Sequence, residues 1–301
     1  MKQDVVLSLG SLTQLTQLEL QVDLLLKAAV APFSCLQQLR ELVLSGAVSS
    51  PDTLLRLPPS LTKLELVWRG EQELSSSLCP DLAALTNLQH LVVTGDSAPG
   101  LLPDFCGSMQ QLRELRLYKI LSPNALPALA RSLPALTRLE GLLLHSISEL
   151  APPPASAEYS ALLPLSLHIT SIDMTWWDHG NLLHDGCGQH FLAAGRQLPQ
   201  LKRLMLGLED NWDVWDENVR LGALANCTSG VGTCLGEGSL SKLVNCCPGL
   251  QQLGIPGLVE PGVQMQPLLQ LTALTWLSVG GEVVTDDVAC DVLAQLSGLR
   301  Q

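Results

Sequence analysis

The sequence predicts an α/β solenoid, in which one short strand per repeat stacks into a curved, parallel β-sheet. A gapped apolar pattern, L-x-x-L-x-x-L-x-L, returns along the 301 residues at a mean spacing on the order of 26 residues. Leucine accounts for 68 residues, whereas aromatic residues are only 4% of the chain. The 24 glycines and 19 prolines fall largely between copies of the pattern, which favours short elements over long helices.

Each copy of the pattern ends in two apolar residues separated by one residue. These pairs are Leu18/Leu20, Leu42/Leu44, Leu64/Leu66, Leu91/Val93, Leu115/Leu117, Leu142/Leu144, Ile172/Met174, Leu204/Leu206, Leu253/Ile255 and Leu277/Val279. Side chains alternate along a strand, so both members of a pair face the same side. One strand cannot bury its pair alone, and stacked parallel strands therefore share a continuous leucine core.

The step from Leu204 to Leu253 is 49 residues, close to two periods, and predicts one degenerate copy between Gly207 and Leu250. We therefore expect a single array of about 11 repeats over residues 1–301. The last copy begins at Leu296 and is expected to be cut off within the repeat.

The chain between strands must return on the convex side, and Pro103–Gly107 and Pro127–Leu133 suit short helices or 3₁₀ turns entered at proline. An array of amphipathic helices is the alternative, because L-x-x-L also fits one helix face. The recurrent L-x-L pair, with its period of two, favours strands.

These motifs resemble the leucine-rich repeat family over nearly the whole chain, and loosely its plant-type members. The resemblance implies a horseshoe with a parallel sheet on the concave face and short helices, 3₁₀ turns and loops on the convex face. It also implies a protein-binding module, as in receptors, resistance proteins, ubiquitin-ligase adaptors and cytoskeletal or axonemal complexes. The family's asparagine after L-x-L-x-x is missing from every copy here, so its asparagine ladder is not expected.

Three stretches interrupt the period, and we expect insertions near residues 148–166, 176–190 and 209–240. The second carries His179, His184, Cys187 and His190, which are zinc ligands by residue type. A metal-binding role for this loop is an alternative function, although a second tight ligand pair is lacking and an ordinary surface loop is the simpler interpretation. The third contains Trp212 and Trp215 among acidic residues, a composition seen in protein-binding hot spots.

Residues between the paired leucines would form the concave face, the usual binding surface of such arrays. Candidate partner-binding residues there are His90, Arg116, Tyr118, His145, Asp173 and Thr175, joined by Trp212 and Trp215 from the insertion. A purely structural spacer with a solvated sheet face is the alternative.

The charge balance bears on the class of partner. Seventeen basic and 29 acidic residues give a net charge of −12, which argues against nucleic acid as the ligand. The sequence carries no phosphate-binding loop and no G-x-S-x-G elbow, so we expect neither an enzyme nor a cofactor. Membrane insertion is not expected either. Nine irregularly spaced cysteines favour reduced, mostly buried thiols and a cytoplasmic protein, with cytoskeletal or axonemal association as the alternative.

Overall fold

A computed structural model of the chain places a short strand at each leucine pair. It describes residues 12–22, 33–46, 57–68, 82–94, 108–118, 133–147, 168–177, 198–209, 239–255, 265–279 and 287–300. The strands are β1 (Gln17–Val22), β2 (Glu41–Gly46), β3 (Lys63–Trp68), β4 (His90–Thr94), β5 (Glu114–Tyr118), β6 (Gly141–Ile147), β7 (Ser171–Trp177), β8 (Arg203–Glu209), β9 (Gln252–Ile255) and β10 (Trp276–Val279). The chain divides into two compact units, Met1–Leu143 and Leu144–Gln301.

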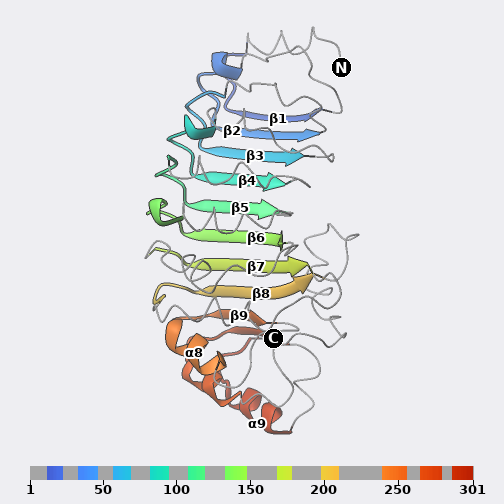
Figure 1. The fold of residues 1–301 in the computed structure, drawn as a ribbon, viewed down its shortest axis with the longest axis vertical. Coiled ribbons are helices and arrows are strands. Elements are labelled where there is room, and N and C mark those ends of the chain that lie inside the picture. Colours follow the sequence, from blue (N-terminus) through green and yellow to red (C-terminus); the bar gives the residue numbers. More distant parts are fainter. Residues whose placement is uncertain are drawn as a thin grey trace. The chain divides into compact units, whose positions relative to one another are not determined.

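In the first unit, strands β1 to β5 are parallel and lie in sequence order, with β6 beginning at the end of the unit (Figure 1). The register aligns the first leucine of each pair across all five strands. This column is Leu18, Leu42, Leu64, Leu91 and Leu115. The predicted parallel sheet is therefore confirmed, and with it the choice of strands over a helical array.

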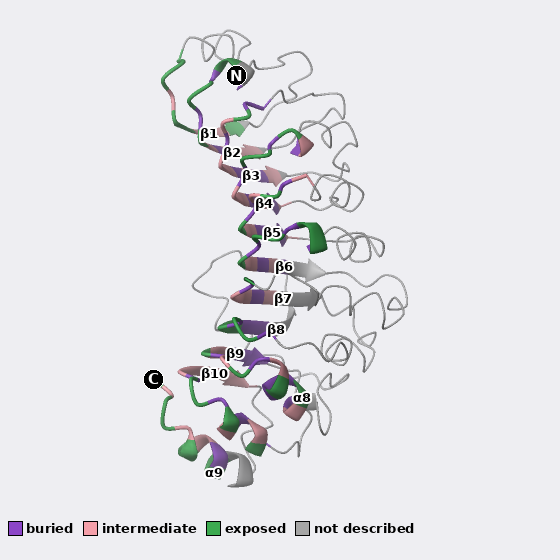
Figure 2. Ribbon diagram, turned by 90° about the vertical axis from the view of Figure 1, so that its left-hand side faces the viewer, coloured by how far each residue is buried: buried purple, intermediate pink, exposed green. Residues whose placement is uncertain are grey.

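The leucine columns form the core of the first unit. Leu42, Leu64 and Leu115 are completely buried, and burial alternates residue by residue along β4 and β5 (Figure 2). Leu18 and Leu20 are only half-buried, because β1 pairs with β2 alone among the described strands.

The L-x-x-L part of the pattern forms a tight turn before the strand. The N–H of Leu39 donates to the carbonyl of Leu36 at 2.9 Å, and the N–H of Leu139 donates to that of Leu136 at 3.1 Å. Such an i to i+3 turn brings both leucines to the inner side without a helix. Short 3₁₀ helices η1 (Phe33–Cys35) and η2 (Leu133–Ala135) precede two of these turns. Pro103–Gly107 lies outside the described residues.

In the second unit, β7 to β10 are also parallel and in sequence order (Figure 1). Ile172, Leu204, Leu253 and Leu277 form one column of the register. Helix α8 (Ser239–Cys246) precedes β9, the 3₁₀ helix η4 (Gln266–Gln270) lies between β9 and β10, and α9 (Asp287–Gln295) follows β10. The horseshoe curvature of the whole array stays a prediction.

Strand β8 pairs directly with β9, in the register Arg203 to Gln252. The degenerate copy expected between Gly207 and Leu250 therefore adds no strand between them, and this part of the prediction was wrong. Counting periods failed because a long connection between neighbouring strands has the same length as two short repeats.

None of the four described cysteines is in a disulfide, but they are not mostly buried as expected. Cys35 and Cys290 are exposed, Cys246 is half-buried and only Cys247 is fully buried. None of them belongs to the L-x-L pairs, so the leucine periodicity gave no guide to their burial.

Candidate functional site

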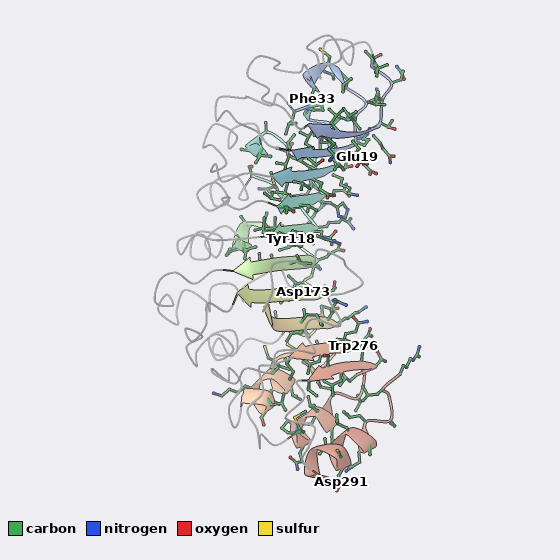
Figure 3. All side chains as sticks on the ribbon, turned by 90° about the vertical axis from the view of Figure 1, so that its right-hand side faces the viewer. Glu19, Phe33, Tyr118, Asp173, Trp276 and Asp291 are labelled. Carbon is green, nitrogen blue, oxygen red and sulfur yellow. The ribbon has the colours of Figure 1, made fainter. Side chains whose placement is uncertain are left out.

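The strands present a second face, which alternates with the buried leucines and is called here the outer sheet face. In the first unit it carries three aligned columns. They are Gln17, Glu41, Lys63, His90 and Glu114; Glu19, Val43, Glu65, Val92 and Arg116; and Gln21, Ser45, Val67, Thr94 and Tyr118. Figure 3 labels Glu19 on β1 and Tyr118 on β5.

A backbone ladder holds this face in register from repeat to repeat. The carbonyl of Arg40, one residue before β2, accepts from the N–H groups of Thr62 and Lys63 at 2.8 and 3.0 Å. The carbonyl of Gln89 accepts in the same way from Arg113 and Glu114. Each repeat thus consists of one turn, one strand and one backbone carbonyl that accepts two hydrogen bonds, and its leucine pair lies in the core. This repeating unit has the pattern of a leucine-rich repeat, the family that the sequence resembles.

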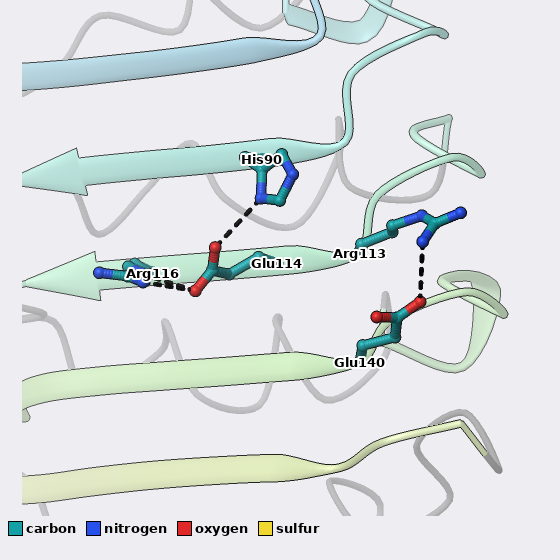
Figure 4. A network of polar contacts seen from close by, with 5 residues as sticks. All are labelled: His90, Arg113, Glu114, Arg116 and Glu140. Carbon is teal, nitrogen blue, oxygen red and sulfur yellow. Dashed lines mark hydrogen bonds and ion pairs between the residues drawn. The ribbon is translucent and has the colours of Figure 1, made fainter.

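The repeats of β4 and β5 bring four polar side chains together, and Figure 4 shows three of them, His90, Glu114 and Arg116. Glu114 stands between two partners: its Oε1 accepts from Nε and Nη2 of Arg116 at 2.8 and 2.6 Å, and its Oε2 lies 3.1 Å from Nδ1 of His90. A carboxylate can only accept, so His90 carries its proton on Nδ1. Arg116 is also hydrogen-bonded to the side chain of Tyr118. We call His90, Glu114, Arg116 and Tyr118 the polar cluster.

Ion pairing governs the charge state of the polar cluster. Partial burial alone would raise the pKa of Glu114, but hydrogen bonds from Arg116 and His90, and the charge of Arg116, outweigh burial and hold it below its usual value. Burial would lower the pKa of Arg116, and its hydrogen bond and ion pair with Glu114 raise it instead. Glu114 and Arg116 therefore stay charged at neutral pH, while about a third of each side chain remains exposed.

Gly141 and the ion pair between Arg113 and Glu140 are the described neighbours of the polar cluster. Gly141 on β6 has no side chain, and a Cβ there would lie 3.6 Å from Cγ of Glu114, so Gly141 itself places no side chain against that flank of Glu114. Arg113, just before β5, bonds instead to Glu140 at 3.2 Å at the end of the strands (Figure 4). This second ion pair is about half exposed and separate from the cluster.

The outer sheet face of the second unit has a different character. Oδ2 of Asp173 on β7 lies 3.6 Å from Nη2 of Arg203 on β8. Nη1 of Arg203 donates a hydrogen bond to Oε1 of Gln252 at 2.9 Å. Met205 lies between the paired residues Leu204 and Leu206, a position expected on the open sheet face, but it is only 6% exposed, because Gly254 on β9 leaves room for its side chain. The Trp276 ring also lies close to Gly254, since its Cζ3 would be 3.3 Å from a Cβ there.

The predicted site residues thus fall into separate groups. His90, Arg116 and Tyr118 come together in the first unit, whereas Asp173 belongs to the second. His145 and Thr175 lie on β6 and β7, but their side chains are outside the described part. The remaining candidates fall outside the described residues: Trp212, Trp215, His179, His184, Cys187 and His190.

Sequence reasoning missed Glu114, the residue that joins the polar cluster. A signal was present in the stretch Glu114–Tyr118, where a carboxylate, a guanidinium and a phenol alternate with leucines and so share one strand face. Within the described ranges, no group of three or more His, Cys, Asp or Glu side chains could hold a metal ion, and no helix has the length and apolar character needed to span a bilayer.

Comparison with known proteins finds solved structures but no relatives. No family model matches the chain, and no curated protein matches it. A leucine-rich repeat protein of Leptospira interrogans, LIC12759, is 15% identical with a TM-score of 0.37, covering 97% of this chain and 85% of its own. TLR13, in a complex with ssRNA13, is 20% identical with a TM-score of 0.41. That match covers 82% of this chain, which spans only 36% of TLR13.

Proposed function

We propose that this chain is a non-enzymatic protein-interaction module that binds a protein partner through the outer sheet face of its first unit. The observation that supports this most is the polar cluster on β4 and β5. It combines a phenol, a guanidinium and an imidazole on a rigid sheet, and tyrosine and arginine are the residues that most often dominate binding energy at protein interfaces.

The internal bonds of the cluster favour binding. Arg116 is already held by Glu114 and Tyr118, so less side-chain entropy is lost when a partner contacts it. His90 remains 42% exposed and Arg116 37% exposed at the side chain, which leaves surface to be covered.

Charge favours a protein over a nucleic acid as the partner. Glu19, Glu41 and Glu65 lie on the same face, on β1 to β3, and the chain carries a net charge of −12. Phosphate backbones are bound mainly by clustered Lys and Arg, and a face with this many carboxylates repels them. A cytoplasmic setting and the absence of catalysis are part of the same proposal.

The test is affinity capture from cells of the source organism, with quantitative mass spectrometry. The double variant Arg116→Ala/Tyr118→Ala is compared with wild type and with Arg113→Ala, a matched control that removes an arginine from an exposed ion pair beside the same strand. The proposal expects at least one protein to be lost, by tenfold or more, from the double variant and retained by the control. Identical capture by all three chains would contradict it and favour the structural spacer.

A further inference from the structure

An apolar strip crosses the outer sheet face of the first unit. Its members stand on four successive strands: Val43 on β2, Val67 on β3, Val92 on β4 and the ring of Tyr118 on β5. Val43 and Val92 belong to one column of the register, whereas Val67 and Tyr118 belong to the next. The strip therefore zigzags between two columns, and all four residues are partly exposed.

Each residue of the strip has a polar neighbour two positions earlier on the same strand, and strand alternation places this neighbour on the same face. In the order of the strip, these neighbours are Glu41, Glu65, His90 and Arg116. The flank of the strip thus changes from carboxylates on β2 and β3 to an imidazole and a guanidinium on β4 and β5. Glu19 on β1 stands opposite Val43 in the register and adds a third carboxylate at the acidic end.

The carboxylates at the acidic end differ from Glu114, which is already paired with Arg116. Glu19, Glu41 and Glu65 form no ion pair with any other residue that the structure describes. Lys63 is the one cation on this face of β1 to β3, against three carboxylates. The acidic end therefore presents a net negative charge to a partner, beside a strip of apolar surface.

We propose that the outer sheet face of the first unit binds a basic amphipathic helix of its protein partner. The helix lays its apolar side chains along the strip and places lysine or arginine against Glu19, Glu41 and Glu65. This inference names the class of partner and rests on the proposed function. An apolar centre with a polar rim of complementary charge is the usual anatomy of a specific protein interface.

The spacing of the strip favours a helix over an extended segment. Neighbouring strands lie about 4.8 Å apart, so the strip advances by about 4.8 Å per residue and spans roughly 14 Å. The apolar stripe of a helix advances by three or four residues, or about 4.5–6 Å per step, and zigzags in the same way. Side chains on one side of an extended segment are about 6.6–6.8 Å apart, and they lose step with the strip within three strands.

The probes are three synthetic peptides of about 18 residues, each held helical by a lactam bridge away from its leucines. The basic helix has one leucine stripe flanked by lysines. The acidic helix has glutamate in place of lysine, and the permuted helix has the composition of the basic one with its leucines spread around the axis. Fluorescence anisotropy measures the binding of each peptide to the full chain. The basic helix should bind at least tenfold more tightly than the other two, and more weakly as salt is added. No binding of the basic helix, or equal binding of either comparison peptide, would overturn the proposal.

A matched pair of double variants tests the charged flank. Glu41→Gln/Glu65→Gln removes two carboxylates beside the strip, whereas Glu140→Gln/Asp291→Asn removes two exposed carboxylates elsewhere. Each variant loses two negative charges, which changes the net charge from −12 to −10, so a nonspecific attraction for lysine would fall equally in both. The first variant should bind the basic helix about fivefold more weakly, as expected for the loss of two exposed ion pairs, and the second less than about twofold more weakly. Equal weakening in the two variants would refute the proposed contacts.

The variant Val43→Thr/Val92→Thr tests the apolar strip. Threonine keeps the branched shape that suits a strand but puts a hydroxyl in place of a methyl group. Binding of the basic helix should weaken about fivefold, because less apolar surface is removed from water. Unchanged affinity would show that the strip is not part of the binding surface. The comparison of the three peptides on the wild-type chain tests the proposal even where this variant does not fold.

Two results distinguish a wrong class of partner from a wrong function. If affinity capture loses a protein from Arg116→Ala/Tyr118→Ala while the basic helix binds no better than the acidic one, the face binds a partner of different chemistry. The proposed function then stands, and the basic helix is refuted. If the capture loses no protein, the proposed function is refuted, and the basic helix with it.

Discussion

Gly249 lies against the backbone of Pro199 in the preceding repeat of the sheet: a Cβ at Gly249 would be 2.9 Å from the Pro199 carbonyl oxygen. Gly249→Ala should therefore destabilise the second unit by about 1–3 kcal/mol, since the backbone itself must move. Gly254→Ala is the comparison and should cost less, because its Cβ would meet side-chain atoms instead of backbone: Cε and Sδ of Met205, and Cζ3 of Trp276 at 3.3 Å. Urea unfolding of both variants measures the difference. If Gly254→Ala lowered the free energy of unfolding as much as Gly249→Ala or more, the spacing of the repeats would not depend on the glycine at position 249.

Leu115 is fully buried in the leucine column of the first unit. Leu115→Ala should lower the free energy of unfolding by about 2–5 kcal/mol, through lost burial and a cavity between stacked strands. The matched change Glu65→Ala, on the outer sheet face, should stay within about 0.5 kcal/mol. Similar losses from the two changes, measured by urea unfolding, would be incompatible with the observed register.

Much of the fold follows from the sequence because one physical pattern repeats. L-x-L has the two-residue period of a strand, and both leucines are buried only when neighbouring strands stack. Strand positions and register could therefore be predicted from the pairs that begin at Leu42, Leu64 and Leu91, and from similar pairs. The 49-residue step before Leu253 could not be interpreted in this way, because a period count does not show whether an extra segment adds a strand or only a long connection.

The candidate site was predicted less completely, for a different reason. His90, Arg116 and Tyr118 were placed on one face by strand alternation, but their joining through Glu114 depends on side-chain rotamers and on a neighbour 24 residues away. Strand alternation carries no information on rotamers. The burial of Met205 likewise depends on Gly254 lying beside it across the long connection.

Met205 should behave as a core residue although it belongs to the outer sheet face. Met205→Ala is expected to cost about 2 kcal/mol or more, because a side chain only 6% exposed loses its packing over Gly254. Ser278→Ala, at the corresponding position of β10, is the control and should change stability by about 0.5 kcal/mol at most. Thermal or urea unfolding distinguishes the two, and a neutral Met205→Ala would mean that its burial contributes nothing.

The ion pair between Glu114 and Arg116 predicts a pH-dependent stability. The pKa of Glu114 is lower in the folded chain than its usual value, so its carboxylate stabilises the fold above about pH 4.5, and this contribution disappears as the pH falls through the lower folded pKa. Wild type should therefore be more stable than Glu114→Gln at pH 7 by at most about 1 kcal/mol, since the side chain is one-third exposed. The two should converge as the pH falls through this lowered pKa. Repeating the change in an Arg116→Ala background isolates the pair, because removing the main donor should shrink the difference at pH 7. A gap between wild type and Glu114→Gln that is constant from pH 7 to pH 3, or unaffected by Arg116→Ala, would show that this carboxylate gains nothing from its partners.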